Sequence, residues 1–303
     1  MMNCSPFRYP GGKSRLSIAQ LILGHAPAAY TEYAEPFVGG GGVFFAIPSH
    51  IDRWINDRHP GLVAVYLALR DRPEQFIRRC REIPAAESHQ RGWARRKSYD
   101  DDHLRRVFEQ FRDRDCDDAA LRYLFLNRTS ILGRVNYAHR TRMYFSNPAG
   151  WNIIRTRRLE AAAARLKGTR ITCGDFEPLF EGSAVGTRWI YADPPYWSDT
   201  RASRTAKLYE HSFTVDDHER LADCVRRCQH QVLLSYDDAP EIRHLYRGFK
   251  IVPVQWTYVG ALGSRRRGSE LLIANYDFPA LGRWDESKSN RQTVAVSGTR
   301  GSP

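Results

Sequence analysis

The chain has 303 residues, enough for one large domain with a smaller inserted or appended one. Its 46 Lys and Arg residues outnumber 34 Asp and Glu, and the resulting charge of +12 favours a polyanionic partner such as nucleic acid, although a basic protein without such a partner would have the same composition. The six cysteines form no disulfide framework or matched metal-ligand pairs, and no apolar run is long enough to cross a membrane, so we expect a cytoplasmic protein without disulfides, metal or membrane anchor.

The first eighty or so residues alternate between predicted helices and strands. The pattern predicts a helix over 14–24, a strand over 30–37 that runs into four consecutive glycines, a helix over 43–46, a strand over 53–56 and a helix over 61–70. Such alternation is typical of a doubly wound α/β sheet, in which the ligand-binding loops lie along one edge. We therefore expect an α/β fold of this class.

The composition changes over residues 83–150, where arginines crowd among aromatic and acidic residues. We expect a separate, basic helical module here, inserted into a sheet domain that consists of residues 1–82 and 151–280. Residues 281–303 are polar and aperiodic, and we expect this tail to be disordered.

The pattern of strands and helices resumes after the insert. It predicts helices over 155–166 and 218–228, strands over 170–173, 188–192 and 231–235, and an antiparallel pair over 250–258 and 270–276. The antiparallel pair would close one edge and make the sheet mixed.

The segment Asp193-Pro194-Pro195-Tyr196 directly follows one of these apolar strands. Open α/β sheets bind ligands at the carboxyl ends of their strands, and two prolines stop the strand and stiffen the turn. The Asp193 carboxylate and the Pro194 carbonyl would accept two hydrogen bonds from one amino group, while the Tyr196 ring offers a face to a flat ring. The segment therefore predicts a site that holds an exocyclic amine.

Other segments are candidates for ligand contacts. Gly39 to Gly42 would let the backbone approach a nucleoside and Asp57 suits ribose hydroxyls, although a flexible loop and a solvated acid share these patterns. Lys13 suits a ligand carboxylate, with a solvated lysine as the alternative. Asp175-Phe176 joins a hydrogen-bond acceptor to a ring on which adenine could stack, with a capping Asp beside a buried Phe as the alternative. The glycines match neither a dinucleotide nor a phosphate-loop signature, which disfavours a dehydrogenase.

Taken together, these segments resemble the Dam-like, D12-type family of DNA adenine-N6 methyltransferases of class α. The matching segments are FRYPGGK at 7–13, EPFVGGGGVFF at 35–45, Asp57, CGDF at 173–176, DPPY at 193–196 and ELLIANY at 270–276. The resemblance implies a methyltransferase-type mixed sheet with an inserted target-recognition module, S-adenosylmethionine as cofactor and double-stranded DNA as partner. It further implies transfer of a methyl group to N6 of a flipped-out adenine without a metal, in a bacterial or phage-encoded protein, which we expect to be a monomer.

The resemblance also implies roles for particular residues. The residues that would be catalytic and hold the target base are Asp193, Pro194, Pro195 and Tyr196. The residues that would bind the cofactor are Tyr9, Lys13, Glu35, Pro36, Phe37, Gly39, Gly40, Asp57, Asp175, Phe176 and Asp193. Positioning of two bound reactants lowers a barrier by up to ~7 to 11 kcal/mol, so geometry would matter more than strong base catalysis.

The candidate DNA contacts lie in two places. The insert departs from the family pattern after residue 129, so the recognised sequence is not predicted. Arg128, Arg134 and Asn136 are candidates there, since Arg suits guanine and Asn suits adenine in the major groove, with phosphate contact or solvation as the alternative. The run Arg265-Arg266-Arg267, between the last two predicted strands, is either a phosphate contact or a charged hairpin tip.

Other functions are compatible with parts of this pattern. N4 of cytosine, or an adenine in RNA, also fits an acceptor turn with a stacking ring, and a non-catalytic DNA-binding protein would retain the pocket without turnover. Asp193 at the first position of its motif and the order of the segments favour adenine in DNA. The intact glycine run and Asp193 speak against a non-catalytic protein.

Overall fold

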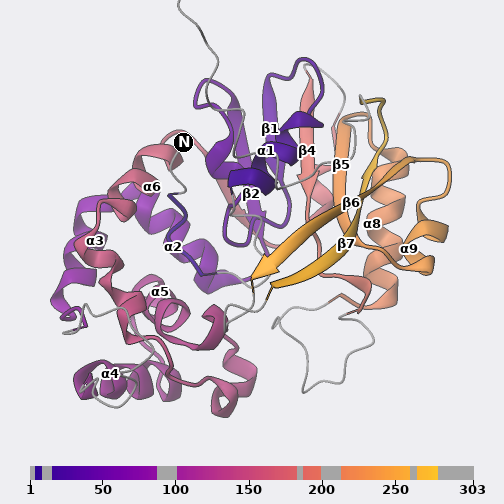
Figure 1. The fold of residues 1–303 in the computed structure, drawn as a ribbon. Coiled ribbons are helices and arrows are strands. Elements are labelled where there is room, and N and C mark those ends of the chain that lie inside the picture. The colour runs from indigo at the N-terminus through magenta and orange to yellow at the C-terminus, as the bar shows by residue number, and fades with distance from the viewer. Residues whose placement is uncertain are drawn as a thin grey trace, which may run out of the picture.

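Seven strands form one mixed sheet in the computed structural model, which describes residues 4–8, 16–86, 101–182, 187–198, 213–259 and 265–278. The strand order is β3-β2-β1-β4-β5-β7-β6 (Figure 1). The strands are β1 (Glu32–Glu35), β2 (Asp52–Asp57), β3 (Arg170–Cys173), β4 (Arg188–Ala192), β5 (Gln231–Asp237), β6 (Lys250–Val259) and β7 (Arg265–Ala274). Strands β1 to β5 are parallel, and β7 pairs antiparallel with β5 and β6. The expected α/β class with an antiparallel edge pair is confirmed.

Both faces of the sheet are buried. Tyr33 and Leu233 pack into a cluster on one face, and their neighbours Ala34 and Leu234 pack into a cluster on the other. Successive side chains of a strand point to opposite faces, so a strand that is covered on both sides is apolar throughout. This is why the central strands read as continuous apolar runs in the sequence.

Helices cover the two faces and extend beside the sheet. They are α1 (Leu16–Gly24), α2 (Pro60–Asp71), α3 (Pro73–Glu82), α4 (Asp102–Asp113), α5 (Ala119–Thr129), α6 (Arg158–Leu166), α8 (Val215–Arg227) and α9 (Pro240–Leu245). Buried side chains of α2 and α6 belong to the first cluster, and those of α8 and α9 belong to the second, so the sheet is doubly wound. None of the helices that the structure describes is long and apolar enough to cross a bilayer.

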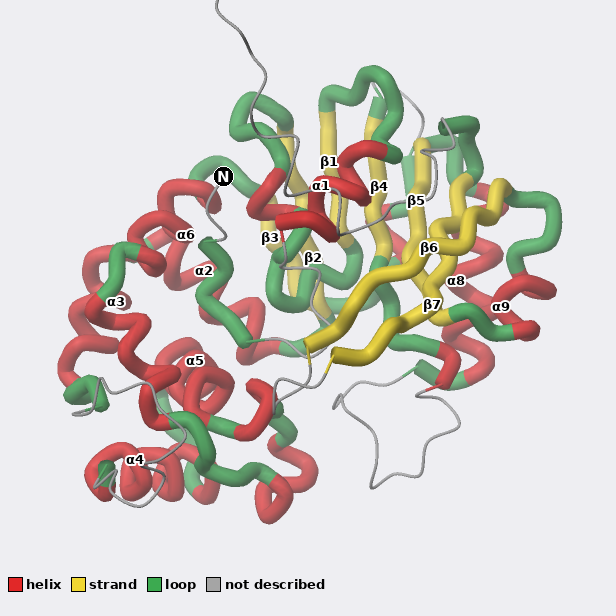
Figure 2. Tube along the Cα trace, viewed as in Figure 1, coloured by secondary structure: helices red, strands yellow, loops and turns green. Residues whose placement is uncertain are grey.

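The described part of the stretch 83–150 is largely helical, and Figure 2 shows α4 and α5 beside the sheet. Phe108 of α4 and Phe125 of α5 belong to the same buried cluster as Tyr66 of α2. Gly61 of α2 lies so close to Tyr123 of α5 that an added Cβ would stand 2.8 Å from that ring. The helices therefore share a continuous core with the sheet domain, whereas the arginine-rich sequence suggested a separate body.

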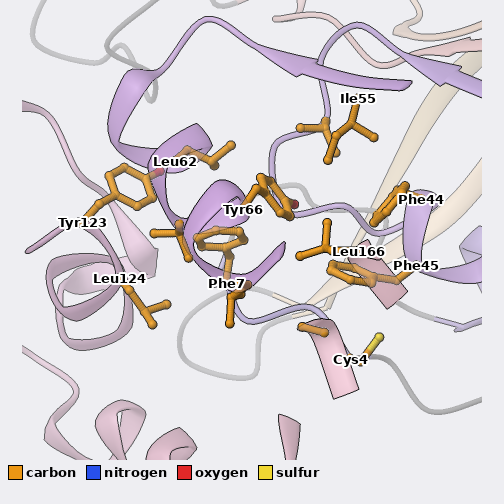
Figure 3. Close-up of a cluster of buried hydrophobic side chains, with 14 of the residues drawn as sticks. Cys4, Phe7, Phe44, Phe45, Ile55, Leu62, Tyr66, Tyr123, Leu124 and Leu166 are labelled. Carbon is orange, nitrogen blue, oxygen red and sulfur yellow. The ribbon is translucent and has the colours of Figure 1, made fainter. Parts of the chain in front are cut away.

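The amino-terminal segment joins these two parts. Phe7 packs edge-on against Tyr66 and Tyr123, with ring centroids 5.1 and 6.0 Å apart (Figure 3). The backbone N–H of Arg8 donates to Asn127 Oδ1 at 2.9 Å, and Asn127 Nδ2 donates back to the Arg8 carbonyl at 2.8 Å. The fully buried Asn127 thus holds the start of the chain against the end of α5.

Several boundaries differ from the sequence-based prediction. Strand β1 is shorter than the predicted strand over 30–37, and the predicted helix over 43–46 is only the 3-10 turn η1 (Phe44–Ala46). Helix α6 begins at Arg158, three residues after the predicted start at 155, because the residues before it form the 3-10 helix η5 (Pro148–Arg155). Strand β7 begins at Arg265, so Arg265-Arg266-Arg267 lies inside the ladder, opposite 257–259 of β6, and is not a hairpin tip. Backbone pairing extends this strand through polar residues that show no alternating pattern.

Candidate active site

The carboxyl ends of three adjacent parallel strands bring carboxylates to one edge of the sheet. Glu35 ends β1, Asp57 ends β2, and Asp193 directly follows β4. Strand β1 pairs with β2 on one side and with β4 on the other, so the order of the sheet reverses between β1 and β4. In doubly wound folds such a reversal opens the crevice in which ligands bind. The predicted Glu35, Asp57 and Asp193 therefore meet at the switch point of this sheet.

Asp193 is half-buried, and hydroxyl groups of neighbouring side chains contact its carboxylate. Ser235 Oγ, on β5, donates a hydrogen bond to Asp193 Oδ1 at 2.7 Å, and the Tyr191 hydroxyl lies 2.8 Å from Ser235 Oγ. The Tyr196 hydroxyl lies 3.5 Å from the same Asp193 oxygen. The catalytic aspartate predicted from the sequence is therefore fixed by residues of two neighbouring strands.

Tyr196 is half-buried, and its hydroxyl lies among acidic groups. Burial, the charges of Asp193 and Glu270, and hydrogen bonding to Glu270 raise the pKa of Tyr196 well above its ordinary value. Glu270 opens the ELLIANY segment and is 1% exposed. The phenol therefore stays neutral and has acceptors on both sides. Between Asp193 and Tyr196 in the chain, Pro194 is buried and Pro195 is half-buried.

Glu35 is a buried acid, 3% exposed. The Tyr33 hydroxyl donates to Glu35 Oε2 at 2.6 Å. Burial raises the pKa of Glu35 well above its ordinary value, and the charges of Asp193 and Asp57 raise it further, while the hydrogen bonds from Tyr33 and from the Phe44 backbone oppose the change. A cation at this edge would favour the ionised form of Glu35.

The glycine run is held in one conformation by Asp57 and Tyr66. Gly39 has φ 45°, its N–H donates to Asp57 Oδ2 at 2.9 Å, and its carbonyl accepts from the Tyr66 hydroxyl at 2.9 Å. Asp57 Oδ1 accepts from the His59 N–H at 2.9 Å, at the start of α2. Asp57 is thus an anchor of the loop, in contrast to a solvated acid.

Asp175 and Phe176 lie in the loop after β3. Phe176 is 4% exposed and packs against Phe37 and Phe213, at centroid distances of 5.4 and 5.7 Å. Arg220 of α8 donates to Asp175 Oδ2 at 2.7 Å and lies over the Phe176 ring, 4.9 Å from its centroid. Burial works against the ionised form of Asp175, but the Glu177 N–H and Arg220 outweigh it and lower the pKa of Asp175. The ring is buried and the Glu177 N–H donates to Asp175 Oδ1 at 3.0 Å, as the alternative of a capping Asp beside a buried Phe predicted. The contact with adenine stays a prediction.

Arg220 was not predicted from the sequence. Its guanidinium binds three carboxylates, with Glu177 at 2.8 Å and Asp217 at 2.9 Å in addition to Asp175. It fastens the loop after β3 to α8. A single arginine in an amphipathic helix carries no local signal for such a role.

The remaining predicted cofactor residues are placed as follows. The Pro36 carbonyl accepts from Asn56 Nδ2 at 3.1 Å, and the Gly40 carbonyl accepts a hydrogen bond from Ser5 Oγ. Tyr9 and Lys13 lie outside the described residues. Among the described residues no cluster of three or more His, Cys, Asp or Glu side chains is arranged to hold a metal ion.

The candidate DNA-binding residues of the insert have different environments. Arg128 is half-buried, its Nε donates to the Gly150 carbonyl at 3.0 Å, and burial together with the charges of Arg8 and Arg158 lowers its pKa to about 9. Asn136 is 8% exposed, and its Oδ1 accepts from a backbone N–H at 3.0 Å. Arg134 is half-buried. Arg128 and Asn136 therefore hold the insert's own backbone in this conformation.

One surface of the insert was not predicted from the sequence. Leu132 has φ 56°, a left-handed conformation that is unfavourable for a leucine, and is 38% exposed. Ile131 and Tyr144 are also exposed, and the Ile131 N–H donates to the Tyr144 carbonyl at 3.1 Å. The run Ser130-Ile131-Leu132-Gly133, apolar within a basic stretch, was the available signal. The insert thus combines a strained backbone position with exposed apolar side chains at one surface.

Comparison with known proteins assigns the chain to a family. The model of the D12 class N6 adenine-specific DNA methyltransferases matches residues 9–259. The chain is 27% identical to the Type II methyltransferase M1.LlaDCHI of Lactococcus lactis subsp. cremoris, over 91% of this chain and 96% of that protein. It is 26% identical to the Type II methyltransferase M.MjaIII of Methanocaldococcus jannaschii, over 91% of this chain and 100% of that protein. It is also 26% identical to the DNA N-6-adenine-methyltransferase of Escherichia phage P1, over 82% of this chain and 32% of that protein. Because the family model covers most of the sequence, the chain belongs to the D12 class N6 adenine-specific DNA methyltransferases, which methylate adenine in DNA at N6.

Proposed function

We propose that the carboxyl edge of the sheet binds S-adenosylmethionine beside an adenine flipped out of duplex DNA, and that Asp193, Pro194, Pro195 and Tyr196 form the catalytic segment. The observation that carries this proposal is the position of Asp193, at the switch point and held by Ser235 at 2.7 Å, with the buried Glu35 on the neighbouring strand. Cofactor and target base would meet where β1 and β4 end.

The residues at this edge suit a positively charged cofactor that carries hydroxyls and a flat base. Three carboxylates, of Glu35, Asp57 and Asp193, end adjacent strands, and the charges of Asp57 and Asp193 act on Glu35. S-adenosylmethionine, when bound, supplies a methyl group activated by a positive sulfur. The residues that would hold it are Tyr9, Lys13, Glu35, Pro36, Phe37, Gly39, Gly40, Asp57, Asp175 and Phe176.

Asp193 and the Pro194 carbonyl would act on the adenine amino group. An aryl amine is a poor nucleophile because its lone pair is delocalised into the ring. Acceptors for both N–H bonds draw the nitrogen toward tetrahedral geometry and aim its lone pair at the methyl carbon. These two groups would hold the nitrogen in line with the methyl group that the cofactor supplies, and the Asp193 carboxylate would accept the proton that the nitrogen loses on methylation. Positioning of this kind supplies as much as ~7 to 11 kcal/mol.

Tyr196 would receive the flipped base. The target nitrogen is out of reach inside a duplex, so the adenine must leave the stack, at a cost of a few kcal/mol. Tyr196 is half-buried and its hydroxyl interacts with Asp193 and Glu270, which supports a role as a stacking platform. Phosphate contacts elsewhere would offset the cost of flipping.

The DNA would lie across this edge, between the insert and the antiparallel pair. Glu270 of β7 is level with Asp237 at the carboxyl end of β5, so Arg265-Arg266-Arg267 extends past that end, on the same side as Asp193. Figure 1 shows the paired strands β6 and β7 reaching beyond their neighbours. These arginines and Arg134 would contact DNA, while Arg128 and Asn136 would support the insert. The exposed Leu132 fits the apolar side chains that enter DNA base steps.

The test is methylation of unmethylated DNA with S-adenosylmethionine, followed by mass spectrometry of the nucleosides. Wild type, Asp193→Ala and Asp223→Ala are compared, the last being a matched control because Asp223 pairs with Arg226 on the exposed side of α8. We expect N6-methyladenine from wild type and the control, and none from Asp193→Ala, with DNA affinity retained in all three. Methylated cytosine would move the substrate to the N4 amine. Undiminished turnover by Asp193→Ala would refute the mechanism.

A further inference from the structure

A chain of hydroxyl groups lies behind the catalytic carboxylate. Ser235 Oγ donates to Asp193 Oδ1 at 2.7 Å, and the Tyr191 hydroxyl lies 2.8 Å from Ser235 Oγ. Ser235 and Tyr191 are both 0% exposed. Neither side chain can touch DNA or cofactor, so any effect on the reaction must pass through Asp193.

The sheet register explains why these residues meet. Ala192 of β4 is level with Leu234 of β5, so the next residues, Asp193 and Ser235, lie side by side. Tyr191, two residues before Asp193, points to the same face of the sheet. The arrangement therefore depends on the pairing of β4 with β5, which the sequence motif around Asp193 does not contain.

The direction of the hydrogen bonds follows from the chemistry of the groups. An ionised carboxylate only accepts, so the single hydroxyl hydrogen of Ser235 goes to Asp193. Ser235 must then accept from Tyr191, whose hydroxyl is the donor. The bonds run from Tyr191 to Ser235 to Asp193, and hydrogen bonds in such a series polarise and strengthen one another.

We propose that Ser235 is a positioning residue for the methyl transfer: it fixes the rotation of the Asp193 carboxylate, so that its outward oxygen meets the adenine amino group. This proposal rests on the catalytic role of Asp193. Without the Ser235 hydrogen bond, the carboxylate would rotate about its side-chain bonds and lose the alignment of the amine lone pair with the methyl carbon. A misplacement of about 1 Å costs roughly 10²-fold in rate.

The experiment compares single-turnover rates, kcat and KM of wild type, Ser235→Ala, Ser235→Thr and Tyr191→Phe. We expect kcat of Ser235→Ala to fall by roughly 10²-fold, with KM for cofactor and DNA within about threefold of wild type. Ser235→Thr keeps the hydroxyl donor and should regain most of the lost rate. Tyr191→Phe leaves the Ser235 donor in place and should show a smaller loss.

Controls separate positioning from folding and from failure of the proposed function. Tyr276→Phe removes a hydroxyl of a half-buried tyrosine that follows β7 and donates to the His25 carbonyl at 2.7 Å, and this variant should turn over as wild type does. Full activity of Ser235→Ala beside an inactive Asp193→Ala would overturn the inference alone. The inference would also be wrong if Ser235→Thr had the melting temperature of wild type but were as slow as Ser235→Ala. It would be wrong as well if the lower kcat of Ser235→Ala came with a lower melting temperature and a weaker affinity for the cofactor. Activity of Asp193→Ala would overturn the proposed function itself.

Discussion

The glycine run offers a quantitative test, because Gly41 is constrained in two ways. It has φ 68°, and an added Cβ would stand 2.8 Å from the Tyr66 hydroxyl and 3.0 Å from the Phe45 ring. An L-residue in this conformation costs about 1–2 kcal/mol. If the Cβ also displaces Tyr66 from the Gly39 carbonyl, the broken hydrogen bond costs about 1–3 kcal/mol more. We therefore expect Gly41→Ala to lower the free energy of unfolding by about 2–5 kcal/mol.

The double mutant separates the two contributions. Tyr66→Phe removes the hydroxyl that the Cβ meets, so Gly41→Ala should cost mainly the backbone strain, about 1–2 kcal/mol, in that background. Urea unfolding of the cofactor-free proteins, followed by circular dichroism, gives all four free energies of a double-mutant cycle. The matched control is Gly168→Ala, where φ is 74° and an added Cβ meets nothing within 4 Å, so only strain is expected.

The expected coupling between Gly41→Ala and Tyr66→Phe is about 1 kcal/mol or more, in the direction that makes the double mutant less destabilised than the sum. Additivity within about 0.5 kcal/mol would show that the Cβ does not disturb Tyr66, and the reasoning from the Cβ distance would be wrong. A cost of Gly41→Ala no greater than that of Gly168→Ala would lead to the same conclusion.

Three further properties of the site can be tested by substitution. The pKa of Glu35 is raised in the folded state, so the protonated form stabilises the fold at low pH, and this contribution is lost as the pH rises through the folded-state pKa. In urea titrations without cofactor, Glu35→Gln should therefore gain stability relative to wild type between about pH 5 and about pH 8. A stability difference that stays constant with pH would contradict this. Arg220→Met should change stability little, because its ion pairs are partly exposed, but should weaken cofactor affinity in calorimetry by releasing Asp175; an unchanged Kd would make the clamp irrelevant. Replacing Arg265-Arg266-Arg267 by serines should weaken DNA binding for all sequences. The slope of log binding constant against log salt concentration should fall in magnitude by about 1 for each phosphate that is no longer neutralised. An unchanged slope would exclude these arginines from the interface.

Local signals were sufficient for the sheet and for the chemistry at its edge. The strands predicted over 170–173 and 188–192 are those observed. Strand β4 is buried along most of its length, because a strand inside the sheet is covered on both faces, whereas β3 lies at the edge of the sheet and has no buried residue. Proline and glycine have the same backbone preferences in any fold, so the turn at 193–196 and the glycine run could be placed in advance. The antiparallel pair was predicted, but its second strand begins at Arg265, five residues before the predicted start at 270. Backbone pairing with β6 extends this strand through residues that show no apolar alternation.

The roles of polar side chains depended on contacts between distant segments. The sequence predicted Asn136 as a base reader and Arg128 as a DNA contact, and in the structure both bond to backbone groups within the insert. Arg220 and Ser235 carry no motif, yet they fix Asp175 and Asp193. A polar side chain has similar local preferences whether its partner is DNA or a carbonyl, so the sequence does not distinguish these cases.

The sequence by itself determined the fold class and the family, and its motif at 193–196 predicted a carboxylate for the target amine, because each rests on residues that are close together in the chain or on apolar periodicity. Only the tertiary structure decided that the insert shares its core with the sheet, that Asp57 and Tyr66 fix the glycine run, and that Ser235 donates a hydrogen bond to Asp193. These features arise from strand register and side-chain packing between segments that are far apart in the chain: the residues of one hydrogen bond are more than a hundred positions apart and those of another are 27 apart. No local pattern encodes which partner a buried polar group will meet.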